Sequence, residues 1–211
     1  MVPELVTAWA AGWAVSRGTH PPTAHPWGCV ITVGLPEQSE RRVVYVPEAD
    51  AVRAACADPV PYAWLKAAED PDVIRRLLPR GWVVDEEDTG HLMAVDLAPP
   101  AGPSTAPPGY VASVNEADGV LHVRVTDAAG GPAAKGQLVV VGDVAVVDRV
   151  VTEEAHRRRG LGRLVMRTLG EHALAAGAFT GVLGATDDGR ALYETLGWKR
   201  HTALTACAYR P

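Results

Sequence analysis

Four arginines and two glycines are crowded into the seven residues 157–163, RRRGLGR. Glycine has no Cβ atom, so a ligand can come close to the backbone N–H groups around it. Arginine side chains attract anions and bind phosphate oxygens well. These residue types at this spacing predict an anion site, and a polyphosphate is the natural ligand. The residues expected to bind it are Arg157, Arg158, Arg159, Gly160, Leu161, Gly162 and Arg163.

The elements on either side would position this segment. Residues 144–151 are rich in valine and predict a mostly buried strand, and apolar residues spaced by three and four from Leu161 onward predict a helix. The first N–H groups of a helix lack partners within it, and the helix dipole favours negative charge there. Arginines at this end oppose the dipole, whereas a bound anion would reverse that effect. The alternative is a solvated basic turn.

Two common phosphate motifs do not fit. A Walker loop needs Gly-Lys-Ser/Thr, and a dinucleotide turn needs a third glycine where this chain has Val165. The segment instead resembles the pyrophosphate loop of the GCN5-related N-acetyltransferases (GNAT superfamily), Arg/Gln-x-x-Gly-x-Gly/Ala. Arg157, Gly160 and Gly162 match this pattern.

A second segment, residues 181–200, carries the same resemblance. Its pattern Leu-Tyr-x-x-Leu-Gly-aromatic is met by Leu192, Tyr193, Leu196, Gly197 and Trp198. The resemblance implies that Tyr193 protonates the departing coenzyme A thiolate, which a phenol of roughly similar basicity can do. The alternative is a core tyrosine with a satisfied hydroxyl.

The chain departs from the family pattern at two turns. Glu154 stands where a proline often follows the strand, and Thr186 stands where an asparagine is common ahead of the tyrosine helix. We expect Asp187 or Asp188 to cap that helix. These changes affect turn chemistry more than activity.

The resemblance implies an N-acetyltransferase that uses acetyl-coenzyme A as co-substrate and transfers acetyl to an amine by direct attack. It also implies that the pantetheine lies along Val150 and Val151. The amine must lose a proton, so a base is expected. Asp148 is the only carboxylate within the strand and is the candidate, with Glu153 and His156 as alternatives. Asp148 is equally compatible with a structural role beside an arginine.

Composition limits the class of protein. A net charge of −5 and a pI of about 5.8 argue against nucleic acid as the partner, despite the arginine cluster. Three cysteines fit no paired metal spacing, so we expect no metal and a reducing cytoplasm. Residues 5–15 resemble a secretory segment, but no basic residue precedes them, so we predict a helix with Trp9 and Trp13 in the core and no membrane association.

Residues 98–109, APPAGPSTAPPG, have the composition of a linker. They divide the chain into an N-terminal α+β domain (1–98), a linker (99–109) and a GNAT acetyltransferase domain (110–211). The predicted fold class is α/β (α+β), with a mixed, largely antiparallel GNAT-type sheet flanked by helices. Strands are expected at 29–33, 42–46, 63–67, 110–114, 121–126, 137–141 and 203–209, with 82–84 and 91–97 as a strand pair.

The order of elements near Trp82 repeats near Trp198, because a strand and a short helix precede Gly-Trp in both places. The N-terminal half is therefore either a degenerate GNAT-like copy without the arginine loop, or an unrelated unit. A copy could not catalyse by the same route, because it has Leu77 or Leu78 where the tyrosine would fall.

Two other functions are compatible with the sequence. One is a non-catalytic acyl-coenzyme A binding or regulatory module, with the N-terminal half as a ligand or homodimer surface. The other is RNA binding through residues 157–163, which the acidic balance and the lack of interleaved aromatic residues disfavour. No motif identifies the acyl acceptor, so small amines, antibiotics and protein amines all remain candidates.

Overall fold

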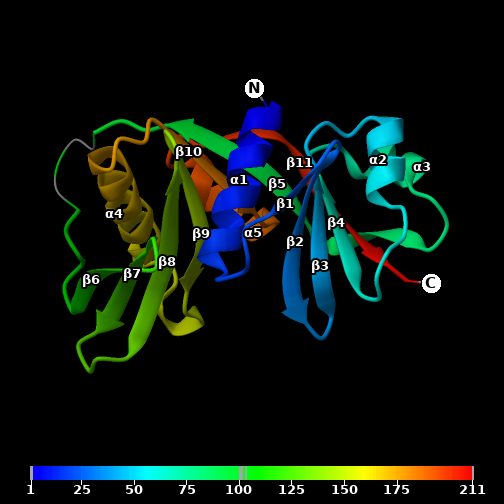
Figure 1. Cartoon of the computed structure of the whole chain (residues 1–211). Helices are drawn as coiled ribbons and strands as arrows, with labels where there is room; N and C mark the ends of the chain where they lie inside the picture. Colours follow the sequence, from blue (N-terminus) through cyan, green and yellow to red (C-terminus); the bar gives the residue numbers. More distant parts are fainter. Residues whose placement is uncertain (1, 100–101, 103, 211) are drawn as a thin grey trace.

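The computed structural model describes residues 2–99, 102 and 104–210 of the chain, so residues 100, 101 and 103 of the predicted linker lie outside the described residues. One mixed, mostly antiparallel sheet of eleven strands runs through the molecule in the order β1-β2-β3-β4-β11-β5-β10-β9-β8-β7-β6 (Figure 1). The strands are β1 Thr23–His25, β2 Gly28–Leu35, β3 Gln38–Val44, β4 Ala63–Ala67, β5 Trp82–Asp96, β6 Tyr110–Ala117, β7 Val120–Asp127, β8 Pro132–Val141, β9 Val144–Thr152, β10 Thr180–Ala185 and β11 Lys199–Tyr209.

Among the described residues, five α-helices flank this sheet, as the GNAT-type fold class predicts. Alternate residues of β9 show that the helices cover both faces of the sheet. Val146 packs in the core under α1, whereas Ala145 and Val147 belong to the core under α4. The helices are α1 Val2–Ser16, α2 Ala49–Ala55, α3 Pro71–Leu77, α4 Leu161–Ala175 and α5 Asp187–Glu194.

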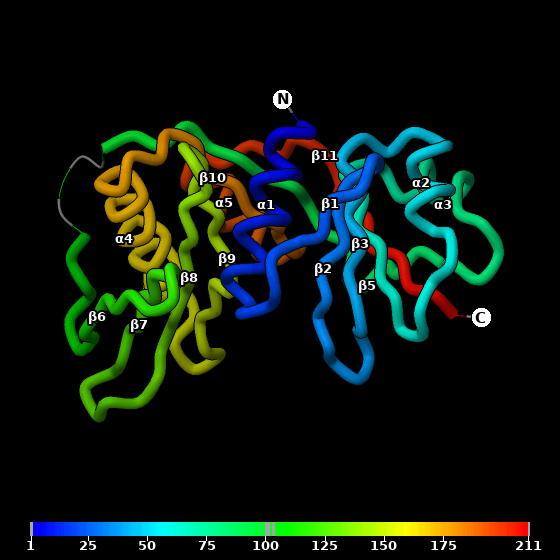
Figure 2. Tube along the Cα trace, viewed as in Figure 1, coloured from blue at the N-terminus to red at the C-terminus, as the bar shows by residue number. Residues whose placement is uncertain are grey.

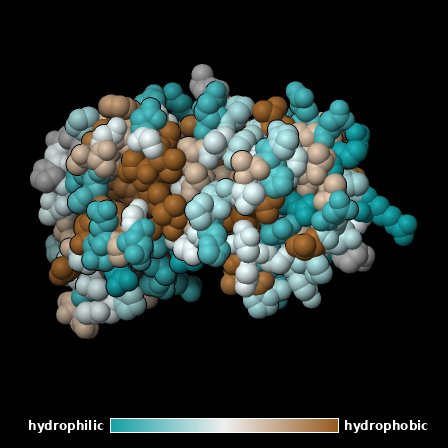
Figure 3. Space-filling view, viewed as in Figure 1, coloured by the Kyte–Doolittle hydropathy of each residue, from teal (hydrophilic) through white to brown (hydrophobic). Residues whose placement is uncertain are grey.

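Helix α1 confirms the helix predicted for residues 5–15. Trp9 and Trp13 are buried against the sheet, as expected for core residues. A Cβ atom on Gly12 would lie 2.4 Å from Cγ2 of Val146, so glycine allows this helix to lie close on β9. Viewed from the same side as in Figure 1, apolar residues gather on the surface between α4 and α1 (Figure 3). Among the described residues, no helix has both the length and the apolar composition needed to cross a membrane.

The two halves of the chain share their central strands. Strand β11, at the end of the chain, lies between β4 and β5 of the N-terminal half and is antiparallel to both. Strand β5, from the N-terminal half, lies between β11 and β10. The C-terminus consequently lies among N-terminal elements (Figures 1 and 2). The halves on either side of residues 99–109 are therefore joined by backbone hydrogen bonds as well as by the linker.

The sheet order also repeats about its centre. Strands β3 and β4 are parallel and precede α3 and β5, and β9 and β10 are parallel and precede α5 and β11. This arrangement supports the interpretation of the N-terminal half as a degenerate copy. The connection between β3 and α2 is short and has Glu48 at the helix N-cap, so it lacks the arginines and glycines of the β9–α4 connection.

The prediction of two strands at 82–84 and 91–97 was wrong, because a single long strand, β5, covers this region. Residues 86–89 bulge away from β11 between the pairs Asp85–Ala206 and Gly90–Leu204. The hydroxyl of Thr89 accepts a hydrogen bond from the N–H of Ala206 at 3.0 Å and so replaces part of the missing ladder. The polar sequence of this segment therefore marks a bulge rather than a turn between two strands.

Candidate functional site

The connection from β9 to α4 leaves a helix N-terminus uncapped. After Thr152 the chain forms a short 3₁₀ turn, Glu154–His156, and then reaches Gly160, which is the N-cap of α4 with φ of 80°. Glycine adopts this left-handed conformation without the strain that a Cβ atom would cause. Gly160 provides no side-chain cap, and the first turn of α4 has no acidic residue. The N–H groups and dipole at this end are therefore available to an anion.

The arginines of this connection, Arg157, Arg158, Arg159 and Arg163, are exposed. Within the described part of the chain, none of them forms an ion pair with a carboxylate. Arg159 instead donates a hydrogen bond from Nη1 to the hydroxyl of Tyr110 at 2.9 Å, and this hydroxyl lies 3.0 Å from Nδ1 of His156. Strand β6 thus holds the β9–α4 connection in place, while the arginines of the connection remain without carboxylate partners among the described residues.

The two glycines have different roles, although the motif alone suggests one role for both. No atom lies within 4 Å of a Cβ built on Gly160, so this residue faces open space. A Cβ on Gly162 would lie 2.8 Å from Cδ2 of Leu192. Gly162 therefore permits close packing of α4 against α5, and Gly160 is the residue beside which a ligand can approach the backbone.

Strands β9 and β10 separate just before this connection. They pair only from Val144 to Val146 and from Thr180 to Val182, whereas β9 continues to Thr152. A bulge in β9 accompanies the separation, because Gln137 pairs with Asp148 and Lys135 with Val151. Arg149, inside the bulge, has φ of 52°. The predicted pantetheine residues Val150 and Val151 lie in this part of β9, where no strand pairs with it on the β10 side.

Tyr193 is buried in the last turn of α5, with 7% of its surface exposed. None of the described residues forms a hydrogen bond with its hydroxyl, whose oxygen is not fully buried. Burial raises the pKa of Tyr193 to about 12, and the negative charge of Asp148 adds to this shift. The hydroxyl is therefore protonated at neutral pH. Thr186, rather than the predicted Asp187 or Asp188, caps this helix by accepting a hydrogen bond from the N–H of Gly189 at 3.2 Å.

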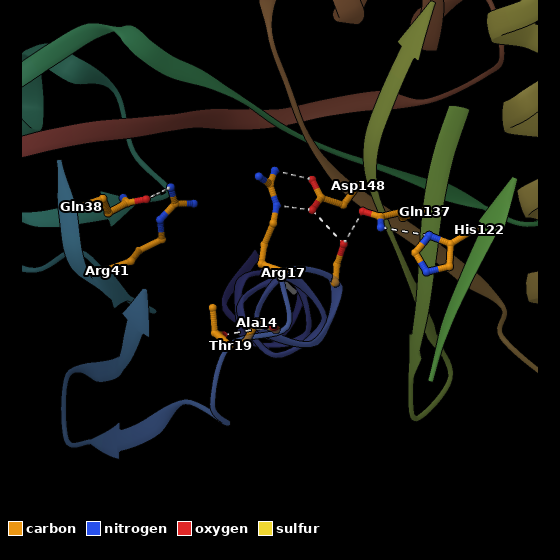
Figure 4. A network of polar contacts seen from close by, with 9 residues as sticks. Ala14, Arg17, Thr19, Gln38, Arg41, His122, Gln137 and Asp148 are labelled. Carbon is orange, nitrogen blue, oxygen red and sulfur yellow. Dashed lines mark hydrogen bonds and ion pairs between the residues drawn. The ribbon is translucent and has the colours of Figure 1, made fainter. Parts of the chain in front are cut away.

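Asp148 is held by the end of α1, as Figure 4 shows. Nε and Nη2 of Arg17 donate to its two carboxylate oxygens at 2.6 and 2.9 Å, and the hydroxyl of Ser16 donates to Oδ2 at 2.9 Å. The Ser16 hydroxyl also donates to Gln137, whose amide contacts Nδ1 of His122. Sequence reasoning left the arginine partner of Asp148 unidentified, because it lies 131 residues away along the chain.

The structure therefore brings most of the predicted site residues to one end of β9. Asp148 lies in β9 next to the bulge, and the arginine connection follows the end of this strand. The charge of Asp148 also contributes to the raised pKa of Tyr193. The alternative bases are less central, since Glu153 is exposed and His156 contacts Tyr110. The described residues contain no cluster of three or more histidine, cysteine or acidic side chains that could hold a metal ion.

Comparison with known proteins agrees with this geometry. Residues 110–200 match the family profile described as an acetyltransferase (GNAT) domain. A GCN5-related N-acetyltransferase from Kribbella flavida is similar over 99% of this chain and 95% of its own, with a TM-score of 0.71 and 17% identity. A GNAT-family protein from Novosphingobium aromaticivorans covers 99% of both chains, with a TM-score of 0.61 and 20% identity.

A tandem GNAT protein from the clavulanic acid biosynthesis pathway is similar over 77% of this chain and 69% of its own, with a TM-score of 0.56 and 16% identity. At such identities these likenesses concern the fold, whereas the profile match concerns the sequence of the C-terminal half. Residues 110–200 are thus an acetyltransferase domain of the GNAT family, within a sheet that the N-terminal half completes.

Proposed function

We propose that this protein is an N-acetyltransferase that transfers the acetyl group of acetyl-coenzyme A to an amine. The observation that carries the proposal is the uncapped N-terminus of α4, where Gly160 has open space beside it and four arginines lack carboxylate partners among the described residues. A pyrophosphate would accept hydrogen bonds from the free N–H groups and would neutralise the arginines. The pantetheine would then follow Val150 and Val151 where β9 leaves β10.

In the proposed reaction the amine attacks the thioester carbonyl directly. A C–N bond forms, the C–S bond breaks, and the thiolate takes a proton from the hydroxyl of Tyr193. Because burial raises the pKa of Tyr193 to about 12, the hydroxyl is protonated at neutral pH when the thiolate leaves. The tyrosinate that remains after the transfer regains a proton from solvent. Positioning of the two substrates provides much of the remaining acceleration.

Asp148 is the proposed acceptor of the proton that the amine loses. Its carboxylate already accepts three hydrogen bonds from Arg17 and Ser16. A carboxylate has about four acceptor positions, so roughly one remains on Oδ1 for the amine or for a water molecule between them. Glu153 and His156 are the alternatives if Asp148 serves only to hold Arg17.

Calorimetric titration with acetyl-coenzyme A tests the proposal without knowledge of the acceptor. We expect micromolar affinity, equal to about −8 kcal/mol. Gly160→Val should weaken binding severely, because its side chain would enter the space beside the helix N-terminus.

Gly177→Val is the matched control, since Gly177 has φ of 86° and open space around it at the other end of α4. It causes similar backbone strain away from the arginines and should bind normally. Absence of binding by the wild-type protein would overturn the proposal. Equal affinity of Gly160→Val and Gly177→Val for acetyl-coenzyme A would show that the β9–α4 connection does not bind the coenzyme. Coenzyme binding without transfer to any amine would favour the non-catalytic module.

A further inference from the structure

Arg41 of β3 is a half-buried cation without an anionic partner among the described residues. Its Nε atom is buried, and no group among the described residues accepts a hydrogen bond from it. Nη2 donates a long hydrogen bond, 3.3 Å, to Oε1 of Gln38. A guanidinium has five N–H donors, and the described residues accept a hydrogen bond from only one of those of Arg41. Buried charges in proteins are normally paired, because their desolvation is costly.

A second cation lies on the same aromatic ring. The guanidinium carbon of Arg41 is 4.0 Å from the centroid of the Trp13 ring, and that of Arg17 is 5.2 Å from the same centroid. The ring stabilises both charges only partly. Asp148 pairs with Arg17, which leaves the charge of Arg41 uncompensated. Figure 4 shows both side chains extending into the region between β3 and β9.

The charged residues around Arg41 do not neutralise its positive charge. Burial, and next the charge of Arg17, lower the pKa of Arg41 to about 10, so it remains charged at neutral pH. Asp88 and Asp148 act on Arg41 from a distance without forming an ion pair with it. Lys66, which is on the neighbouring strand β4, donates from Nζ to the backbone oxygen of Asp88 at 2.5 Å.

Arg41 is also connected to the proposed reaction site. Arg41 and Arg17 both lie over the Trp13 ring, and Arg17 holds Asp148. Asp148 is in the part of β9 that none of the described strands pairs with on the β10 side. The coenzyme is proposed to bind at the β9–α4 connection, whereas Arg41 reaches this region from β3 in the N-terminal half. The N-terminal half would thus contribute to specificity.

We propose that the acyl acceptor is an amine that also carries an anionic group, a carboxylate or a phosphate, and that this group binds Arg41 beside Arg17. The inference rests on the proposed function, because it names the acceptor class of the same site. Arg41 is a specificity-determining residue here, and it takes no part in the bond changes.

The test compares matched amines with and without an anion. Glycine, 4-aminobutanoate and 6-aminohexanoate are measured against alkylamines of the same length, and phosphoethanolamine against ethanolamine. The length series reports the distance from the reacting carbonyl to the cation, and the phosphoethanolamine arm separates phosphate from carboxylate. For the preferred anionic amine we expect kcat/KM roughly 10- to 100-fold above its neutral analogue, as for hydrogen bonds to a charged group.

Arg41→Met should bring this ratio close to one and leave the affinity for acetyl-coenzyme A unchanged, and Arg41→Lys should restore part of it. Arg53→Met, on the exposed side of α2, is the control and should keep the ratio. The melting temperature of Arg41→Met should equal or exceed that of the wild type, because the unpaired charge is removed. A purely structural arginine would give a lower melting temperature in that variant.

Three results would overturn the inference while the proposed function stands. They are equal use of neutral amines, a ratio unchanged in Arg41→Met, and coenzyme binding without acetylation of any anionic amine. If acetyl-coenzyme A does not bind, the proposed function fails. Melting temperatures measured with the anionic amines then test separately whether Arg41 binds an anion. The anionic amines should raise the melting temperature of the wild type and leave that of Arg41→Met unchanged, and no shift in the wild type would overturn the site.

Discussion

Tyr193 combines burial with a free hydroxyl. The apolar surroundings that keep this phenol protonated also leave it without a hydrogen-bond partner among the described residues. The hydroxyl oxygen itself is not fully buried, so a ligand can reach it. A protonated phenol that a ligand can reach makes Tyr193 the residue whose role is easiest to test.

Tyr193→Phe should lower kcat by about 100-fold, in the range typical of a lost general acid, and should leave the affinity for acetyl-coenzyme A nearly unchanged. Steady-state kinetics and calorimetry measure the two effects separately. Tyr209→Phe is the control, because Tyr209 packs on Trp82 in the N-terminal half. Equal turnover in the wild type and Tyr193→Phe would show that the tyrosine serves packing alone.

Lys66 provides a prediction about pH and stability. Burial, and next the charge of Arg41, lower the pKa of Lys66 to about 7. In the unfolded chain this amine keeps its proton to a much higher pH. Between these pKa values the unfolded state binds more protons, so the free energy of unfolding should rise with pH. The cost of the buried ammonium is fully present below pH 7 and declines above it.

Denaturant unfolding of the wild type and Lys66→Met from pH 6 to 9 measures this effect. The wild type should gain stability relative to Lys66→Met above about pH 7, by at most about 1.4 kcal/mol per pH unit. The range stops at pH 9 because burial raises the pKa values of Cys56 and Cys207 to about 12, and these thiols then change stability in the opposite sense. A constant difference between the two proteins would contradict the shift at Lys66.

At the scale of elements, the β9–α4 connection depends on a contact that the motif does not contain. The hydroxyl of Tyr110, on β6, binds both Arg159 and His156. Tyr110→Phe should weaken acetyl-coenzyme A binding by roughly 3- to 10-fold, since it removes hydrogen bonds that position the connection. Calorimetry measures the loss, with the exposed Tyr62→Phe as the control. Unchanged affinity would show that the connection keeps its shape without β6.

Individual elements differed in how well local pattern predicted them. Strand β4 begins at Ala63 and ends at Ala67 as expected, because its apolar run is bounded by turn residues on both sides. Strand β5 was predicted as two strands, since residues 85–90 are mostly acidic. Its continuity depends on hydrogen bonds from β11, more than 100 residues later, which no local pattern reveals.

At the scale of the whole molecule, the exchange of β5 and β11 makes the halves interdependent. A fragment of residues 110–211 lacks β5, so β10 and β11 would each lose a neighbouring strand. We expect this fragment to show no cooperative unfolding transition and to gain one when residues 1–109 are added. Circular dichroism on heating measures both. Cooperative unfolding of the fragment alone would show that the predicted domain at 110–211 folds without the N-terminal half.

The sequence by itself determined the local features of this protein. Residues 157–163, the helix that follows them and the pattern around Tyr193 depend on neighbours in the chain, and they were sufficient to predict the GNAT fold. They are also the basis of the proposed anion site. Tertiary structure alone decided which side chains meet. The ion pair of Arg17 with Asp148, the unpaired Arg41 on Trp13 and the insertion of β11 beside β5 all join residues far apart in the chain. Such contacts follow from the packing of a whole sheet, because periodicity shows which face a residue takes but not which partner it meets there.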